Sequence, residues 1–263
     1  MTPSREQLLD LLAEYLPRGR ESIREIAGEL KNAACGSLRV PDKVLIILFA
    51  SRAGSNYLGQ LLTSTGWFRE INESFRPSQL VKIRDRHGLA DLCEAAQWMI
   101  DNRGTKEAFG LKAGFNVLVS AAELGFLSDV IDRAHIVLLR RRDRLAQAVS
   151  IHKMNLTGRT HSGQPEDRLL TDDDYDERAI ASEIRNIETV EKGCADLTQR
   201  LGKSPTIAYY EDLCRSPKTL VAAICETMGL PMPEDYKPAV RVQVLRDDLS
   251  NRWIERFRAA QSA

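Results

Sequence analysis

A turn of small and polar residues is the first stretch whose composition suggests chemistry. Residues 50–56 (Ala-Ser-Arg-Ala-Gly-Ser-Asn) follow an unbroken apolar run from Val44 to Phe49 and precede leucines at helical spacing. This pattern predicts a strand buried on both faces, then a tight turn and a helix. Such a unit directs backbone N–H groups and the positive end of the helix at an anion. Because Arg52 adds a permanent cation, we predict that the turn binds a phosphate or a group of similar shape.

The turn by itself leaves a second interpretation open. It lacks the Walker A pattern Gly-x-x-x-x-Gly-Lys-Ser/Thr. Gly202-Lys203-Ser204 matches the end of that pattern, but Leu197 occupies the place of its first glycine, and the stretch leads from a helix into a strand. An ordinary strand-to-helix connection with a Ser or Asn cap also explains residues 50–56.

A second strand-turn-helix unit carries a concentration of arginine. The apolar run 135–139 is followed by four arginines within residues 140–144 and then by a helical pattern. Arginine is the side chain best suited to planar contacts with phosphate through several hydrogen bonds. Arginine runs are commonly solvated faces, but a position at the carboxyl end of a parallel strand favours a second anion site.

Two carboxylates and one lysine are candidates for a role in the reaction. Glu70 and Glu73 lie directly downstream of the first unit, and one of them is a candidate general base. The alternative is that both are solvated loop charges. Lys112 lies in an apolar stretch between Gly110 and Gly114. It either extends its ammonium to the surface or points into a site, and the glycines favour the second.

Composition narrows the class of protein. The 263 residues suit one large α/β domain, alone or with an appendage. The 37 basic residues balance 37 acidic ones, so we expect no binding to nucleic acid through a general positive field. No apolar run is long enough to span a membrane, and the first residues lack a signal-peptide core. Five scattered cysteines, an odd number, argue against a disulfide framework, so the predicted location is cytoplasmic.

The remaining stretches suggest an organisation around these units. Apolar stripes predict two helices within residues 4–34, which act as a packing arm or as the contact of a possible homodimer. We therefore predict an N-terminal helical extension, 1–40, and a domain at 41–263. Residues 155–175 read as a long loop of the kind that gates a site. The apolar stretch 205–210 predicts a further strand.

The combined pattern resembles the sulfotransferases that use 3′-phosphoadenosine-5′-phosphosulfate (PAPS). It is most similar to the bacterial trehalose 2-sulfotransferase family and its relatives described as lipopolysaccharide sulfotransferases. The resemblance runs from about residue 44 to 258, and its most specific element is Arg141 to Ser150, which contains Gln-Ala-Val-Ser. The stretches that carry it are 50–56, 72–75, 109–112, 141–150, 210–213 and 250–257. The implied fold is P-loop-NTPase-like, with three layers and a central parallel sheet flanked by helices.

The resemblance also implies roles for individual residues. The loop that holds the 5′-phosphosulfate is matched by Arg52, Ala53, Gly54, Ser55 and Asn56. The residues matched to the rest of the donor, the 3′-phosphate above all, are Arg141, Ser150 and Arg246. Glu73 matches the general base for the acceptor hydroxyl, and Lys112 matches a lysine near the acceptor and the transferring group. Sulfuryl transfer has a loose transition state, so Arg52, Lys112 and the helix N-terminus would neutralise charge without a metal.

Three departures from the family pattern concern the acceptor more than the donor. The turn reads Arg-Ala-Gly-Ser-Asn where the family usually has Arg-Ser-Gly-Ser-Thr, which removes a hydroxyl at Ala53 and changes the contact at Asn56. Ser74 displaces the aromatic residue that usually follows the base. The first forty residues have no counterpart in the basic pattern.

The resulting hypothesis is a PAPS-dependent sulfotransferase that releases PAP, uses no metal and acts on a hydroxyl of a carbohydrate or glycolipid. One alternative is a P-loop-type nucleotide kinase or phosphotransferase, against which the missing Walker lysine counts. Another is a non-catalytic nucleotide-binding scaffold on the same fold.

Overall fold

One parallel sheet forms the centre of the molecule. The computed structural model describes residues 2–28, 30, 33, 35–158, 168–241 and 247–261. Within these residues the sheet has the strand order β2-β1-β3-β4, and all three pairings are parallel. Its strands are β1 (Lys43–Phe49), β2 (Ala108–Ala113), β3 (His135–Arg140) and β4 (Thr206–Tyr209). The five central residues of β1 are buried, which confirms the predicted strand with two covered faces.

The strand order places two loops side by side. From β1 the chain continues to β2, which lies on one side of β1, and then to β3, which lies on the other side of β1. The strands β1 and β3 are therefore neighbours, and the strands that follow them in sequence, β2 and β4, lie on opposite sides of this pair. In open α/β sheets ligands bind at this switch point, beyond the carboxyl ends of the strands. Phe49 pairs in register with Leu139, so the segments that follow β1 and β3 leave the sheet together.

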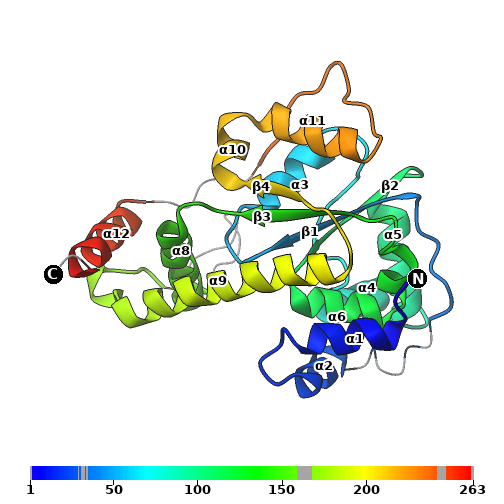
Figure 1. Cartoon of the computed structure of the whole chain (residues 1–263), viewed down its shortest axis with the longest axis horizontal. Helices are drawn as coiled ribbons and strands as arrows, with labels where there is room; N and C mark the ends of the chain where they lie inside the picture. The colour runs from blue at the N-terminus through cyan, green and yellow to red at the C-terminus, as the bar shows by residue number, and fades with distance from the viewer. Residues whose placement is uncertain are drawn as a thin grey trace.

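Helices cover both faces of the sheet (Figure 1). Leu45 and Ile47 of β1 pack in one apolar cluster with the helices α3 (Ser55–Thr63), α10 (Tyr210–Arg215) and α11 (Pro217–Thr227). Val44, Ile46 and Leu48 point the other way, into the main cluster. The helices on that face are α4 (Pro77–His87), α5 (Leu92–Arg103), α6 (Phe115–Glu123), α7 (Phe126–Val130) and α9 (Glu177–Arg200). Alternate β1 side chains thus enter separate cores, and the predicted three-layer fold with a central parallel sheet is confirmed.

The two N-terminal helices, α1 (Arg5–Ala13) and α2 (Arg20–Ala27), pack against α6. The leucines of the α1 stripe, Leu8, Leu9 and Leu12, are at most 2% exposed and belong to the main core. An ion pair between Arg5 and the buried Glu123 joins α1 to α6. These helices therefore act as a packing arm, and the stripe that motivated a homodimer is buried within the chain. The division into 1–40 and 41–263 stays a prediction.

A third cluster lies beyond the carboxyl end of β3. It joins α8 (Arg144–Thr157) to the C-terminal helix α12 (Asp248–Gln261), whose Trp253 is fully buried. Since α8 continues to Thr157, the long loop begins later than the predicted residue 155. Its residues 159–167 lie outside the described part of the chain, and 172–174 form a short 3-10 helix. In the described part, no helix combines the length and apolar character needed to cross a membrane.

The odd number of cysteines argued against disulfides, and for one pair this inference was wrong. Cys35 and Cys93 form a disulfide, which ties the segment before β1 to the first turn of α5. The Gln97 amide, one turn further along α5, bonds both the N–H and the carbonyl of Arg39 in the same segment. An odd count shows only that at least one thiol is unpaired, and proximity across 58 residues of sequence is set by the tertiary fold.

We expect the Cys35→Ser/Cys93→Ser double variant to unfold with a free energy lower by about 2–4 kcal/mol, because the crosslink restricts the unfolded chain. Urea denaturation measures this, and dithiothreitol should destabilise the wild type but not the variant. Cys214→Ser, at an exposed free thiol, is the control. Five titratable thiols in the unfolded, unreduced protein would contradict the pairing.

Candidate active site

The loop between β1 and α3 has an unusual backbone. Arg52 has φ 62°, and among the described residues it is the one non-glycine with a positive φ. Gly54 has φ 93°, and a Cβ there would clash with Cδ2 of Tyr210. Left-handed non-glycine residues are uncommon and concentrate at functional sites. The backbone thus reverses within five residues and begins α3 at Ser55, as the sequence predicted for an anion-binding turn.

Helix α8 holds this loop through two side chains. Gln147 is fully buried, and its Nε2 donates to the carbonyl oxygen of Ser51 at 2.8 Å. One turn further along, Ser150 Oγ accepts from Nε of Arg52 at 2.9 Å. The predicted 5′ and 3′ binding elements therefore touch at Arg52 and Ser150. The sequence motif contained Gln147 without giving it a role, although a Gln among the buried residues Ala146, Ala148 and Val149 was a usable signal.

Arg141 lies beside the same loop. Its guanidinium carbon is 5.0 Å from the centre of the Tyr210 ring, the ring that packs against Gly54. Its Nε is buried and has no hydrogen-bond partner in the described part of the chain. Buried polar groups without partners are rare in folded proteins. The unpaired Nε therefore gives Arg141 a hydrogen-bond donor left for an anion. Burial is the main cause that raises the pKa of the neighbouring Tyr210 to about 12.

The other arginines of the cluster differ in function from Arg141. Arg142 bonds Asp212 through both terminal nitrogens, at 2.9 and 2.7 Å, and stacks 4.1 Å from the Tyr209 ring centre. The hydrogen bond to Asp212 raises the pKa of Arg142. Arg144 bonds the buried Glu191 at 2.9 Å. These two arginines fasten β4, α10 and α9 to the turn, so the density of arginine reflects structure as well as binding.

Glu73 is brought to the opposite side of the loop by the edge of the sheet. Asn72 pairs with Leu111 as an isolated parallel bridge, and its carbonyl accepts from the N–H of Lys112 at 2.9 Å. The next residue, Glu73, forms an ion pair with Arg76. Ser74 is fully buried and donates to Asn72 Oδ1 at 2.5 Å, so it packs inward. The other candidate carboxylate, Glu70, pairs with Arg103.

Lys112 points into the molecule. It is 4% exposed, and its ammonium donates to Oδ1 of Asn56 in the first turn of α3. Burial is the main cause that lowers its pKa, and the negative charge of Glu73 opposes that effect. Of the two interpretations of Lys112, the structure therefore favours a lysine aimed at a site.

The structure thus brings together most of the predicted site. Arg52 meets Ser150 on one side of the loop, and Lys112 meets Asn56 on the other. Arg141 adjoins the loop through the Tyr210 ring, which packs against Gly54. Charge surroundings place Glu73 near Lys112. The remaining donor residue of the prediction, Arg246, lies outside the described residues.

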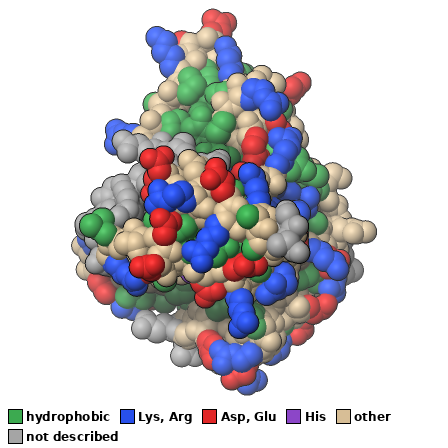
Figure 2. Space-filling view, turned by 90° about the vertical axis from the view of Figure 1, so that its left-hand side faces the viewer, with side chains coloured by type: hydrophobic (Ala, Val, Ile, Leu, Met, Phe, Trp, Pro, Cys, Tyr) green, Lys and Arg blue, Asp and Glu red, His purple; other side chains and the backbone are tan. Residues whose placement is uncertain are grey.

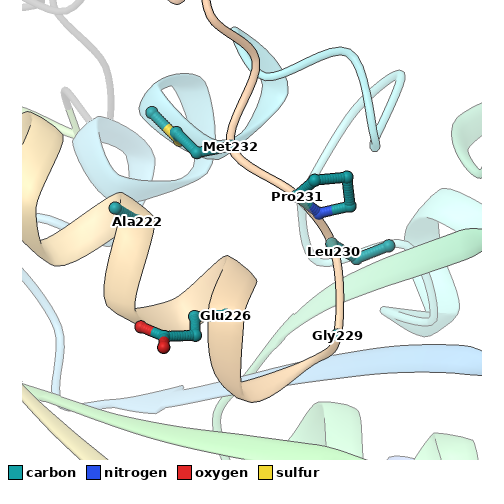
Figure 3. A pocket seen from close by; sticks show the side chains of 6 residues that line it. All are labelled: Ala222, Glu226, Gly229, Leu230, Pro231 and Met232. Atoms are coloured by element: carbon teal, nitrogen blue, oxygen red, sulfur yellow. The ribbon is translucent and has the colours of Figure 1, made fainter.

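The face of the molecule that carries α8 and α12 shows no broad field of one sign (Figure 2). Figure 2 shows the side of the molecule on which α8 and α12 lie in Figure 1, and basic and acidic side chains are interspersed on it. Anion binding at the switch point therefore depends on a few placed groups. A pocket of about 480 Å³ lies elsewhere, lined by Ala222, Glu226 and the segment Gly229 to Met232 (Figure 3). It shares no residue with the loop.

Comparison with known proteins decides the class. A family model described as Stf0 sulphotransferase matches residues 44–260. The chain belongs to the Stf0 sulphotransferase family. The match spans both strand-turn-helix units and confirms the predicted sulfotransferase.

Other comparisons are more distant. A solved structure of retinol dehydratase in a complex with retinol and PAP aligns with this sulfotransferase at a TM-score of 0.43 and 13% identity, over 90% of this chain and 76% of that one. No curated protein sequence matches the chain significantly. In the described ranges, no group of three or more His, Cys, Asp or Glu side chains could hold a metal ion.

The Gly54→Ala variant tests the geometry of the loop. We expect it to lower the free energy of unfolding of the sulfotransferase by about 2–5 kcal/mol, from the left-handed backbone and the clash with Tyr210 together. Gly66→Ala is a matched control, because Gly66 has φ 81° but nothing within 4 Å of the added Cβ. It should lose about 1–2 kcal/mol. Equal losses in the two variants, measured by urea denaturation, would contradict the close packing of Gly54 on Tyr210.

Proposed function

We propose that this sulfotransferase moves a sulfuryl group from PAPS to a hydroxyl of a carbohydrate or glycolipid acceptor, with Glu73 as general base. The observation that carries the proposal is the hydrogen bond between Arg52 and Ser150, at 2.9 Å, which joins the two predicted anion-binding elements of separate strand-turn-helix units. Two such elements side by side suit a nucleotide with phosphates on both its 5′ and 3′ oxygens.

The loop after β1 and the groups that follow β3 are assigned to opposite ends of the donor. The backbone N–H groups of Ala53 to Asn56, at the start of α3, face the 5′-phosphosulfate in this proposal. Arg141, with its buried Nε, and Ser150 bind the 3′-phosphate, and Arg246 completes the set predicted from the sequence. A nucleoside triphosphate has no 3′ anion for the second element, and the loop lacks a Walker lysine. Both points weigh against the kinase alternative.

The reaction then needs charge stabilisation and one proton acceptor. The acceptor oxygen attacks the sulfur in line, the bond from sulfur to the 5′-phosphate oxygen breaks, and PAP leaves with that electron pair. Arg52, Lys112 and the α3 N-terminus stabilise the charge on the sulfuryl and leaving oxygens. Glu73 takes the hydroxyl proton. Its ion pair with Arg76 orients the carboxylate at the edge of β2.

The acceptor class rests on the resemblance to trehalose and lipopolysaccharide sulfotransferases. Residues 69–90, which surround Glu73, and the loop after α8 are the segments expected to contact the acceptor. The homodimer and the cytoplasmic location stay predictions, and the Cys35–Cys93 disulfide is a bond more common in oxidising compartments.

Transfer of radioactive sulfate from labelled PAPS to a panel of sugars and glycolipids tests the proposal. We expect Glu73→Gln to lower kcat by about 10²–10⁴-fold, because the attacking hydroxyl loses its base. Glu70→Gln removes a nearby carboxylate that is paired with Arg103 and that the resemblance does not match to the base, so it should retain most of the activity and serves as the control. An unimpaired Glu73→Gln enzyme would remove Glu73 from the mechanism. Nucleotide binding without transfer to any acceptor would favour the scaffold alternative.

A further inference from the structure

The contact between Lys112 and Asn56 joins the edge strand β2 to the first turn of α3. The Asn56 side chain ends in an amide, whose oxygen is a hydrogen-bond acceptor. That oxygen accepts the hydrogen bond of the Lys112 ammonium. A buried ammonium loses the solvation of water and keeps its charge only with partners.

The charged neighbours of Lys112 are engaged elsewhere. Glu73 forms an ion pair with Arg76, and Glu70 forms one with Arg103. The two carboxylates raise the pKa of Lys112 through their charge, Arg76 lowers it, and desolvation is the largest effect and lowers it. From β1, the ring of Phe49 lies 6.0 Å from the ammonium. By contrast, Asn56, the partner that accepts the hydrogen bond of the Lys112 ammonium, is a neutral side chain.

A neutral acceptor has a distinct chemical consequence. It favours the ammonium form, as any hydrogen bond to the charged state does. Unlike a carboxylate, it does not cancel the positive charge, which stays available to the oxygens of a transferring group. Because Asn56 belongs to the donor loop, the same bond sets the direction of the lysine relative to the donor.

We propose that Asn56 is a positioning residue that holds the Lys112 ammonium, as a cation, toward the transferring sulfuryl group. This inference rests on the proposed function for its catalytic meaning. Its structural content is that the amide oxygen of Asn56 stabilises the charged form of Lys112.

Two substitutions with opposite effects test the inference. Asn56→Leu keeps the size of the side chain but removes the acceptor, and Asn56→Asp keeps an acceptor and adds negative charge. Lys112 acts as a cation, so activity is lost as pH rises through its pKa. Asn56→Leu lowers that pKa, and the basic limb of the kcat profile should move down by about one pH unit. Asn56→Asp should move the limb upward and, since an ion pair competes for the ammonium, lower the maximal kcat.

A second readout does not depend on turnover. Titration of isotope-labelled Lys112 by NMR in the full chain should show the same opposite shifts. The PAP dissociation constant of Asn56→Leu should stay within about threefold of the wild type, a change of less than about 1 kcal/mol, because the substitution keeps the backbone N–H through which residue 56 faces the donor. Asn102→Asp is the control. Asn102 is an exposed residue in the last turn of α5, which precedes the N-terminal end of β2, so its substitution should leave the Lys112 titration unchanged.

The outcomes separate the two claims. Shifts of the same sign in both variants, or none, would overturn the role of Asn56. Loss of PAP binding in Asn56→Leu would also overturn it and make the Asn56 side chain a donor ligand. Opposite NMR shifts in a protein that transfers no sulfuryl group would leave the Asn56–Lys112 contact standing and contradict the proposed function. Circular dichroism of each variant checks that it is folded.

Discussion

A chain that leaves a buried strand and enters a helix within five residues presents free N–H groups only if its backbone reverses sharply. In this protein the reversal requires a left-handed Arg52 and a left-handed Gly54. The first conformation is unfavourable for a side chain with a Cβ, by about 1–3 kcal/mol, and persists where the surroundings impose it. Gln147 and Ser150 of α8 supply that constraint, one through the backbone of Ser51 and one through the arginine itself.

The loop after β1 consequently contacts residues that belong to or follow the two neighbouring strands. On one side it contacts α8, which follows β3, and on the other it contacts Lys112 of β2. Both contacts exist because β1 lies between β2 and β3 in the sheet. The register of these three strands therefore sets the relative positions of the residues proposed to bind the two ends of the donor and the transferring group. Arg142 and Arg144 add to this rigidity by fastening α10 and α9 to the second turn.

The sequence predicted the elements better than their contacts. Continuous apolar runs identified β1 and β3 to within a residue, and the glycines and small residues identified the turn. The left-handed conformation of Arg52 had no signal, because nothing in the residue type requires it. The partners of Arg142 and Gln147, and the pairing of Cys35 with Cys93, depend on segments far apart in the chain. Such contacts follow from the tertiary fold, which local patterns do not specify.

In the proposed function, the contact between Arg52 and Ser150 marks a site for a nucleotide with both 5′ and 3′ phosphates. Calorimetric titration with PAP, beside AMP and ATP with Mg²⁺, measures this directly in the wild type and in Arg141→Ala. We expect tight binding of PAP, weak binding of AMP and ATP, and loss of the preference for PAP in Arg141→Ala. Absence of PAP binding, or stronger binding of ATP with Mg²⁺, would contradict it and favour a kinase.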